Sequence, residues 1–198
     1  AVRFADLGAP DAAARLALRT RLTSPAAQRA IKPHLDRYVA TLPEVRLRVC
    51  GSASTQTLAT SLSRAFASNG FRAAVSEADY GTLMGELIHP EKDADGLVVL
   101  LDHDYFMPKD WRRDADRLRH DLDERVGALA DALQSYCMQT GLPLVTTTLS
   151  RIAAPLAGYA DQTYATGAAR ACDLVNEVLL ATAERTPLLY VLDSDQAM

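Results

Sequence analysis

Strand-like and helix-like patterns alternate along this chain from Val45 onward, and that alternation constrains the fold more than any other feature of the sequence. In VRLRVC at 45–50, apolar residues alternate with arginines, as in a half-buried strand. The run GLVVLLD at 96–102 is continuously apolar, as expected of a central parallel strand that is buried on both faces. The patterns predict five strands, at 45–50, 71–77, 96–102, 143–149 and 187–193.

Helical patterns separate most of these strands. Leu58, Leu62 and Phe66 recur every four residues, and Asn69-Gly70 ends that helix. The longest helix ends at Thr140-Gly141, and its apolar residues recur at steps of three or four: Leu118, Leu122, Val126, Leu129, Leu133 and Cys137. A last helix covers 166–185, whereas 79–95 is read as irregular and 150–164 as a loop.

This order of elements predicts an α/β fold. Right-handed crossovers place helices on both sides of a parallel sheet, so we expect a flavodoxin-like three-layer domain over 45–198, with the five strands in the order 2-1-3-4-5. Two helices, at 11–22 and 25–42, would form a helical arm over 1–44, and Pro33 could kink or shorten the second one. The chain begins at Ala and ends shortly after the fifth strand, so we expect it to be a piece of a longer protein.

Composition excludes several classes of protein. With a net charge of −4 and no basic stripe, the chain is not expected to bind nucleic acid. It has no apolar run of roughly 18 residues, so no membrane partner is expected and a cytoplasmic location is predicted. The cysteines, Cys50, Cys137 and Cys172, lie far apart without a CxxC motif, which predicts reduced thiols and neither a zinc site nor a disulfide framework.

Polar residues follow four of the predicted strands at their carboxyl ends, where open parallel sheets bind their ligands. Ser52 follows the first strand, and it could be a nucleophile, a phosphate-binding hydroxyl or an ordinary helix N-cap, a role that Ser54 could also fill. Gly51 is expected to form the turn on any of these interpretations. The remaining candidates at this edge are Asp102, His103, Asp104, Thr147 and Asp193.

His103 lies between two carboxylates, and it is the histidine that we expect at this edge. It could serve as a general base, with Asp102 and Asp104 orienting its ring, or it could belong to a solvated turn. Cys50 could point to the core or lie beside the turn, and a buried thiol is the simpler expectation.

These segments, taken together from Arg46 to Asp193, resemble the N-terminal region of FkbH-like proteins. The resemblance depends on the Gly51-Ser52 turn, on YGTLMGEL at 80–87 and on the helix that contains Asn176. It implies an SGNH-hydrolase-like domain, followed in the longer protein by a haloacid-dehalogenase-type phosphatase domain that this chain lacks. That missing domain would use magnesium, whereas no cofactor is expected in this one.

The implied role is to form or handle glyceryl or related hydroxyacyl thioesters on an acyl carrier protein in polyketide-type biosynthesis, from a phosphorylated three-carbon donor. In SGNH hydrolases the serine after the first strand is the nucleophile, which corresponds to Ser52, and a glycine such as Gly81 or Gly85 helps to form the oxyanion hole. The chain departs from that pattern, because Asp102-His103-Asp104 stands where an asparagine is expected and Met198 stands where the DxxH histidine is expected. Hydrolase activity would therefore require His103 as a substitute base.

Two functions remain open at this point. In the first, Ser52 takes part in acyl transfer, with Asp or His groups around it. In the second, the domain has lost catalysis and docks a carrier protein or its own phosphatase domain, which predicts that Ser52 and His103 do not make contact. A nucleotide or phosphate binder is a weaker third option, because GSAST lacks the glycines of a P-loop.

Overall fold

The computed structural model describes residues 10–19, 24–52, 55–106, 115–150 and 168–195. The chain forms two compact units. Unit 1 consists of 1–47 and 56–76, and unit 2 consists of 48–55 and 77–198. Strand β1 (Glu44–Gly51) begins in unit 1 and ends in unit 2.

Unit 1 contains the helical arm and the helix that follows β1. Its elements are α2 (Pro10–Arg19), α3 (Pro25–Ala40), α4 (Gln56–Ser68), the first half of β1 and nearly all of β2 (Arg72–Glu77). Ser24 caps α3 by accepting a hydrogen bond from the Ala27 N–H, and Pro25 occupies the first turn, where its missing N–H costs nothing. The helix continues past Pro33 to Ala40, so this proline does not shorten it.

Unit 2 contains the rest of the sheet and four described helices. Its complete elements are α5 (Leu83–Ile88), β3 (Gly96–Leu100), α6 (His103–Phe106), α7 (Ala115–Thr140), β4 (Leu144–Thr147), α9 (Ala168–Arg185) and β5 (Leu189–Leu192). The strand order is β2-β1-β3-β4-β5, which confirms the predicted α/β fold with a five-stranded sheet. Strands β3, β4 and β5 pair in parallel, with Leu97 opposite Leu144 and Val145 opposite Tyr190.

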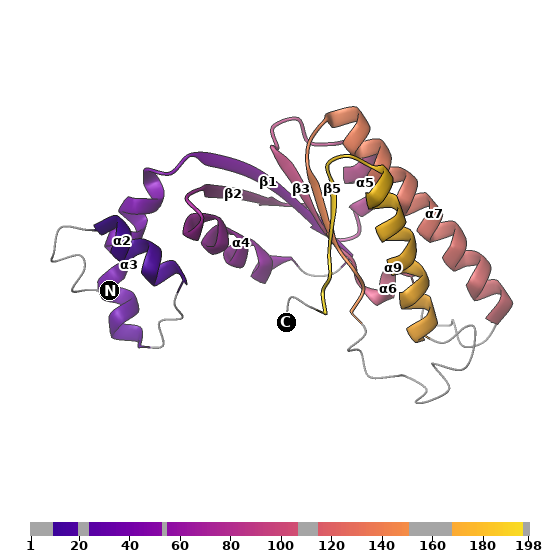
Figure 1. Ribbon diagram of the computed structural model, residues 1–198, viewed down its shortest axis with the longest axis horizontal. Helices are drawn as coiled ribbons and strands as arrows, with labels where there is room; N and C mark the ends of the chain where they lie inside the picture. The colour runs from indigo at the N-terminus through magenta and orange to yellow at the C-terminus, as the bar shows by residue number, and fades with distance from the viewer. Residues whose placement is uncertain (1–9, 20–23, 53–54, 107–114, 151–167, 196–198) are drawn as a thin grey trace. The chain divides into compact units, whose positions relative to one another are not determined.

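The core of unit 2 lies between β3–β5 and the helices α5, α7 and α9. In Figure 1, α7 and α9 run side by side along the strands. Buried residues of both helices, such as Leu129, Leu133 and Val175, pack with Leu97 and Val99 of β3. The apolar face of α7, which its 3.6-residue period predicts, therefore covers the sheet.

Two details of the predicted fold are wrong. Val98 and Leu100 are partly exposed, so β3 is not buried on both faces: the helices of unit 2 cover the face that carries Leu97 and Val99. The stretch 79–95 is not wholly irregular, because α5 lies within it. Most of the predicted loop at 150–164 lies outside the described residues.

The three cysteines are free and buried, and burial was the expectation for Cys50. In the described part of the chain, no helix is both long enough and apolar enough to cross a membrane.

Candidate functional site

The candidate site lies in unit 2, where β1 and β3 end side by side. The Ser52 N–H donates a hydrogen bond of 3.0 Å to the Leu100 carbonyl, which continues the pairing of β1 with β3 past Gly51. A Cβ atom added to Gly51 would lie 2.8 Å from the Leu100 carbonyl oxygen. Glycine is thus required here because the next strand passes so close, and the turn conformation that we predicted is not the reason.

Hydrogen bonds to β3 and to Asp102, two residues past the end of this strand, hold Ser52 in place. Besides its own N–H bond, Ser52 accepts a hydrogen bond at Oγ from the Asp102 N–H, at 2.7 Å. One lone pair of the hydroxyl is thereby used, and no hydrogen bond to a described residue uses its proton, which can be donated to a ligand. Asp102, predicted as a catalytic carboxylate, therefore positions Ser52 through its backbone.

His103 faces a different part of the edge. Its Nε2 lies 3.0 Å from the Ser150 carbonyl oxygen, and its Nδ1 lies 3.6 Å from Oδ1 of Asp102. A carbonyl oxygen can only accept, so Nε2 carries a proton. Among the described residues, no hydrogen bond joins His103 to Ser52. The Ser-His pair that catalysis would require is not formed in this arrangement.

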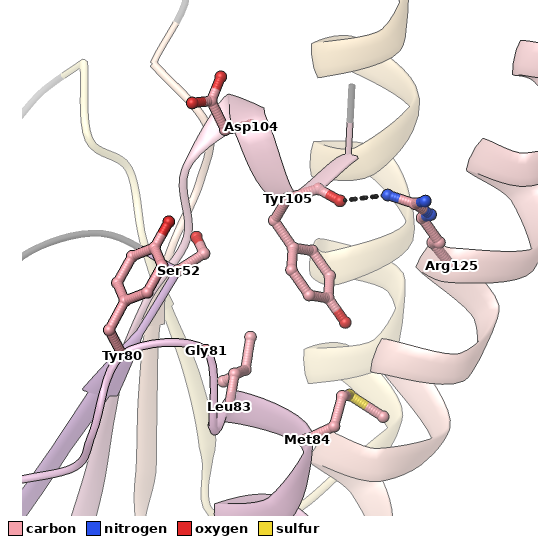
Figure 2. Close-up of a pocket in the computed structure, with 8 residues that line it drawn as sticks. All are labelled: Ser52, Tyr80, Gly81, Leu83, Met84, Asp104, Tyr105 and Arg125. Atoms are coloured by element: carbon pink, nitrogen blue, oxygen red, sulfur yellow. Dashed lines mark hydrogen bonds between the residues drawn. The ribbon is translucent and has the colours of Figure 1, made fainter. Parts of the chain in front are cut away.

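A pocket of about 460 Å³ opens beside Ser52. Figure 2 shows Tyr80 and Tyr105 on two sides of it, with Leu83 and Met84 at the lower end of the view. The eight lining residues come from the end of β1, the segment leading into α5, and α5, α6 and α7: Ser52, Tyr80, Gly81, Leu83, Met84, Asp104, Tyr105 and Arg125. Gly81 has a φ of +81°, a left-handed conformation that favours glycine.

The polar groups of the pocket are varied in kind. Arg125 donates a hydrogen bond of 2.9 Å from Nη1 to the Tyr105 carbonyl, which ties α7 to α6 and leaves other guanidinium N–H groups for a ligand. Burial raises the pKa of the Tyr105 hydroxyl, although Arg125 opposes the shift, so this hydroxyl is protonated at neutral pH. The pocket thus combines neutral hydroxyls, one carboxylate from Asp104 and one cation over an apolar floor.

A second group of side chains continues along the edge to the end of β5. Ser150 donates from Oγ to Oδ1 of Asp195 at 2.7 Å, and the Asp195 N–H donates to Oδ1 of Asp193 at 3.0 Å. Asp193, predicted as catalytic, therefore stabilises a turn. Thr147 is partly exposed on β4 and does not line the pocket.

Ser54 lies outside the described residues. Of the candidates named from the sequence, the structure brings Ser52, Gly81 and Asp104 together in the pocket. In the described part of the chain, no group of three His, Cys, Asp or Glu side chains is arranged to hold a metal ion.

The Cys50 thiol lies next to the site, and its surroundings make it unreactive. Cys50 precedes Gly51 at the end of β1, and its side chain is buried in the core of unit 2. Burial raises the pKa of the Cys50 thiol to about 12. A thiol with this pKa is not a nucleophile at neutral pH.

From the sequence, Tyr105 could be expected either to cover the cleft or to pack the next helix, and the other four lining residues were missed as site candidates. Three of them, Tyr80, Leu83 and Met84, belong to the YGTLMGEL segment, so the resemblance of this segment to a known family was a usable signal. The sequence gave no such signal for Arg125, because this residue lies on the charged face of a long amphipathic helix, where cations are common.

Comparison with solved structures supports the fold alone. The chain is similar to a crystal structure of the N-terminal part of the protein BF1531 from Bacteroides fragilis, which contains a phosphatase domain complexed with Mg. The TM-score is 0.66 at 13% sequence identity, and the match covers 93% of this chain and 45% of that chain. The chain therefore spans less than half the length of this structural neighbour. No family model and no curated protein matches the sequence.

Proposed function

We propose that this chain is the N-terminal domain of an FkbH-like enzyme of the cytoplasm. In this proposal the Ser52 pocket binds the hydroxyacyl group of a thioester carried by an acyl carrier protein, in polyketide-type biosynthesis. Bond making from a phosphorylated three-carbon donor takes place elsewhere in the longer protein, in a magnesium-dependent phosphatase-type domain. The motif resemblance supports this, as does a structural neighbour that is more than twice as long and contains a phosphatase domain.

The observation that carries the binding function is the hydrogen bond from the Asp102 N–H to the Ser52 Oγ. A serine nucleophile needs a base that takes its proton, and the His103 ring interacts with Ser150 and Asp102 instead. A serine held as an acceptor from the backbone is well placed to donate its own proton to a substrate oxygen. This favours the non-catalytic alternative over acyl transfer by Ser52.

The chemistry of the pocket suits a small polar acyl group. A glyceryl group presents two hydroxyls and a thioester carbonyl, for which Ser52 and Tyr105 offer donors and Asp104 offers an acceptor. Arg125 suits an anionic substituent, such as a phosphate on the donor or on the carrier's prosthetic group. Leu83 and Met84 supply the apolar contact that a carbon chain requires.

The test is a calorimetric titration of the chain with glyceryl-loaded carrier protein and with the same carrier unloaded. We expect tighter binding of the loaded form, and Arg125→Gln should weaken the binding of both forms by roughly tenfold, the scale of one hydrogen bond to a charged group, because both carry the phosphate of the prosthetic group. Arg185→Gln, at the end of α9, is the matched control and should leave the titration unchanged. Equal affinity for both forms would refute a pocket that recognises the acyl group.

Intact-mass spectrometry separates binding from catalysis. The proposal expects no covalent adduct after incubation with a glyceryl thioester. An adduct on the wild type that is lost in Ser52→Ala would make Ser52 a nucleophile and overturn the non-catalytic assignment.

A further inference from the structure

The two units carry opposite net charge. The spans of unit 1 hold ten of the chain's 21 Lys and Arg residues but only four of its 25 Asp and Glu residues, so unit 1 has a formal charge of +6. Unit 2 holds the other eleven Lys and Arg residues and the other twenty-one Asp and Glu residues, so its formal charge is −10. The charges of the two units add up to the net charge of −4. An acidic protein thus contains one distinctly basic unit, and such asymmetry is typical of a surface that meets an anionic partner.

An apolar groove lies within this basic unit. Its volume is about 230 Å³, and it is lined by residues of α2, α3 and α4: Ala17, Leu18, Gln28, Ile31, Lys32, Leu35 and Arg64. Ala17 and Ile31 are almost completely buried and form its floor. Leu16, one residue from the groove on α2, exposes 42% of its surface. Leu18 and Leu35, which line the groove, are partly exposed, so apolar surface is open at this place.

Two cations lie at the groove, and they differ in how they are held. Arg64 donates from Nε to the Leu18 carbonyl at 3.0 Å, so it fixes α4 against the carboxyl end of α2, where a positive charge is favourable. Lys32 is exposed, and no hydrogen bond or ion pair joins it to another residue in the described ranges. The Lys32 ammonium can therefore pair with an incoming carboxylate without first losing a partner.

We propose that this groove docks an acidic amphipathic helix of the carrier protein, which makes the inference dependent on the proposed function. An apolar helix face would pack on Leu18 and Leu35 above the floor, and carboxylates beside that face would pair with Lys32 and the neighbouring basic residues of α3. A nucleic acid fits less well, because a phosphate backbone brings no apolar side chains to an apolar floor.

The experiment measures binding of two probes to the full chain at low and physiological ionic strength. One probe is glyceryl-loaded acyl carrier protein. The other is a labelled synthetic helix with leucines at positions i, i+3, i+4 and i+7 and glutamates on the flanks. Lys32→Glu is the test variant, Lys32→Arg the conservative variant, and Arg185→Glu on α9 the matched charge reversal in unit 2. Circular dichroism checks that each variant folds, which is expected because both side chains are exposed.

We expect both probes to bind the wild type, with affinity falling as salt rises. Lys32→Glu should weaken both by roughly tenfold, because an attractive pair becomes a repulsive one, while Lys32→Arg and Arg185→Glu stay within about twofold. A carrier protein that binds wild type and Lys32→Glu equally would overturn the docking site and leave the proposed function intact.

The remaining outcomes distinguish between the possible occupants of the groove. If the peptide binds in a Lys32-dependent way but the carrier does not bind, the groove is an acidic-helix site, and both the carrier assignment and the proposed function fail. A single-stranded oligonucleotide that displaces the peptide at equal concentration would overturn the proposal in favour of a polyanion site. A concentration-dependent dimer abolished by Lys32→Glu would overturn it in favour of self-association.

Discussion

The buried amide of Asn176 provides the sharpest test of how the carboxyl edge is built. Its Oδ1 accepts a hydrogen bond of 2.8 Å from the Leu149 N–H, and its Nδ2 donates one of 3.0 Å to the Leu149 carbonyl. Asn176 is 8% exposed and Leu149 is 1% exposed. The side chain therefore replaces a neighbouring strand for the residues that follow β4.

Asn176→Ala removes both hydrogen bonds and leaves two buried backbone groups of Leu149 without partners. Each such group costs about 1–3 kcal/mol, and the smaller side chain admits some relaxation, so we expect a loss of about 3 kcal/mol in the free energy of unfolding. For a chain of 198 residues, that corresponds to a fall of roughly 6–12 °C in Tm. Asn69→Ala is the matched control: its amide also bonds to a carbonyl, but it is exposed, and the loss should stay below about 1 kcal/mol.

Urea unfolding followed by circular dichroism measures the stability, and hydrogen exchange of the Leu149 amide reports the site directly. Asn176→Asp extends the test, because one oxygen can still accept from the N–H but the other repels the carbonyl unless it is protonated. The aspartate variant should therefore regain stability, relative to wild type, as pH falls from about 7 towards about 4. If Asn176→Ala stays within about 1 kcal/mol of wild type and the Leu149 amide remains protected, the proposed role of this amide is refuted.

Three further predictions concern β1 and α7. Gly51→Ala should lower the free energy of unfolding by about 2 kcal/mol or more, because the new Cβ meets backbone at 2.8 Å. Gly127→Ala in α7 has open space and should raise the free energy of unfolding by about 0.5–1 kcal/mol, and thermal melts of both variants test this. Arg48→Met should lower the free energy of unfolding by about 2 kcal/mol, because Arg48 binds both carboxylate oxygens of Glu86, at 2.6 and 3.0 Å. In a double-mutant cycle, adding Glu86→Leu should restore part of that free energy, because the carboxylate left without its partner is then removed. Burial raises the pKa of the Cys50 thiol from an ordinary value of 9.0 to about 12, so its contribution to stability is complete below pH 9.0 and is lost as pH rises towards about 12. Unfolding free energy should then fall by about 1 kcal/mol between about pH 9 and 10, and an equally steep fall in Cys50→Ala would contradict this cause.

Much of the fold follows from periodicity. The five strands and the α7 core positions could be predicted because alternation, a short apolar run or a period of 3.6 over a full element leaves a strong pattern. The six-residue α5 could not, since LMGELI spans fewer than two turns and contains Gly85. Nor does an apolar run reveal which face a helix will cover, and this is why Val98 and Leu100 were wrongly expected to be buried.

The site was predictable in position more than in detail. The rule that ligands bind at the carboxyl edge made Ser52 and Asp104 candidates, and both line one pocket. It could not show that the backbone of Asp102 would donate to Ser52, because hydrogen bonds of this kind depend on the exact path of two chain segments. The basic character of unit 1 was equally hidden, because its residues come from two separate spans of the sequence and the acidic remainder of the chain masks their charge in the total.

That two-span construction also limits how the protein can have changed during evolution. The chain passes from one unit to the other after Leu47, returns after Thr55 and leaves again after Ser76. A recombination event near Glu44 would transfer α2 and α3 without α4, whose Arg64 holds the end of α2. Each unit consists of two separate segments of the chain, so a single crossover cannot transfer one unit whole without part of the other.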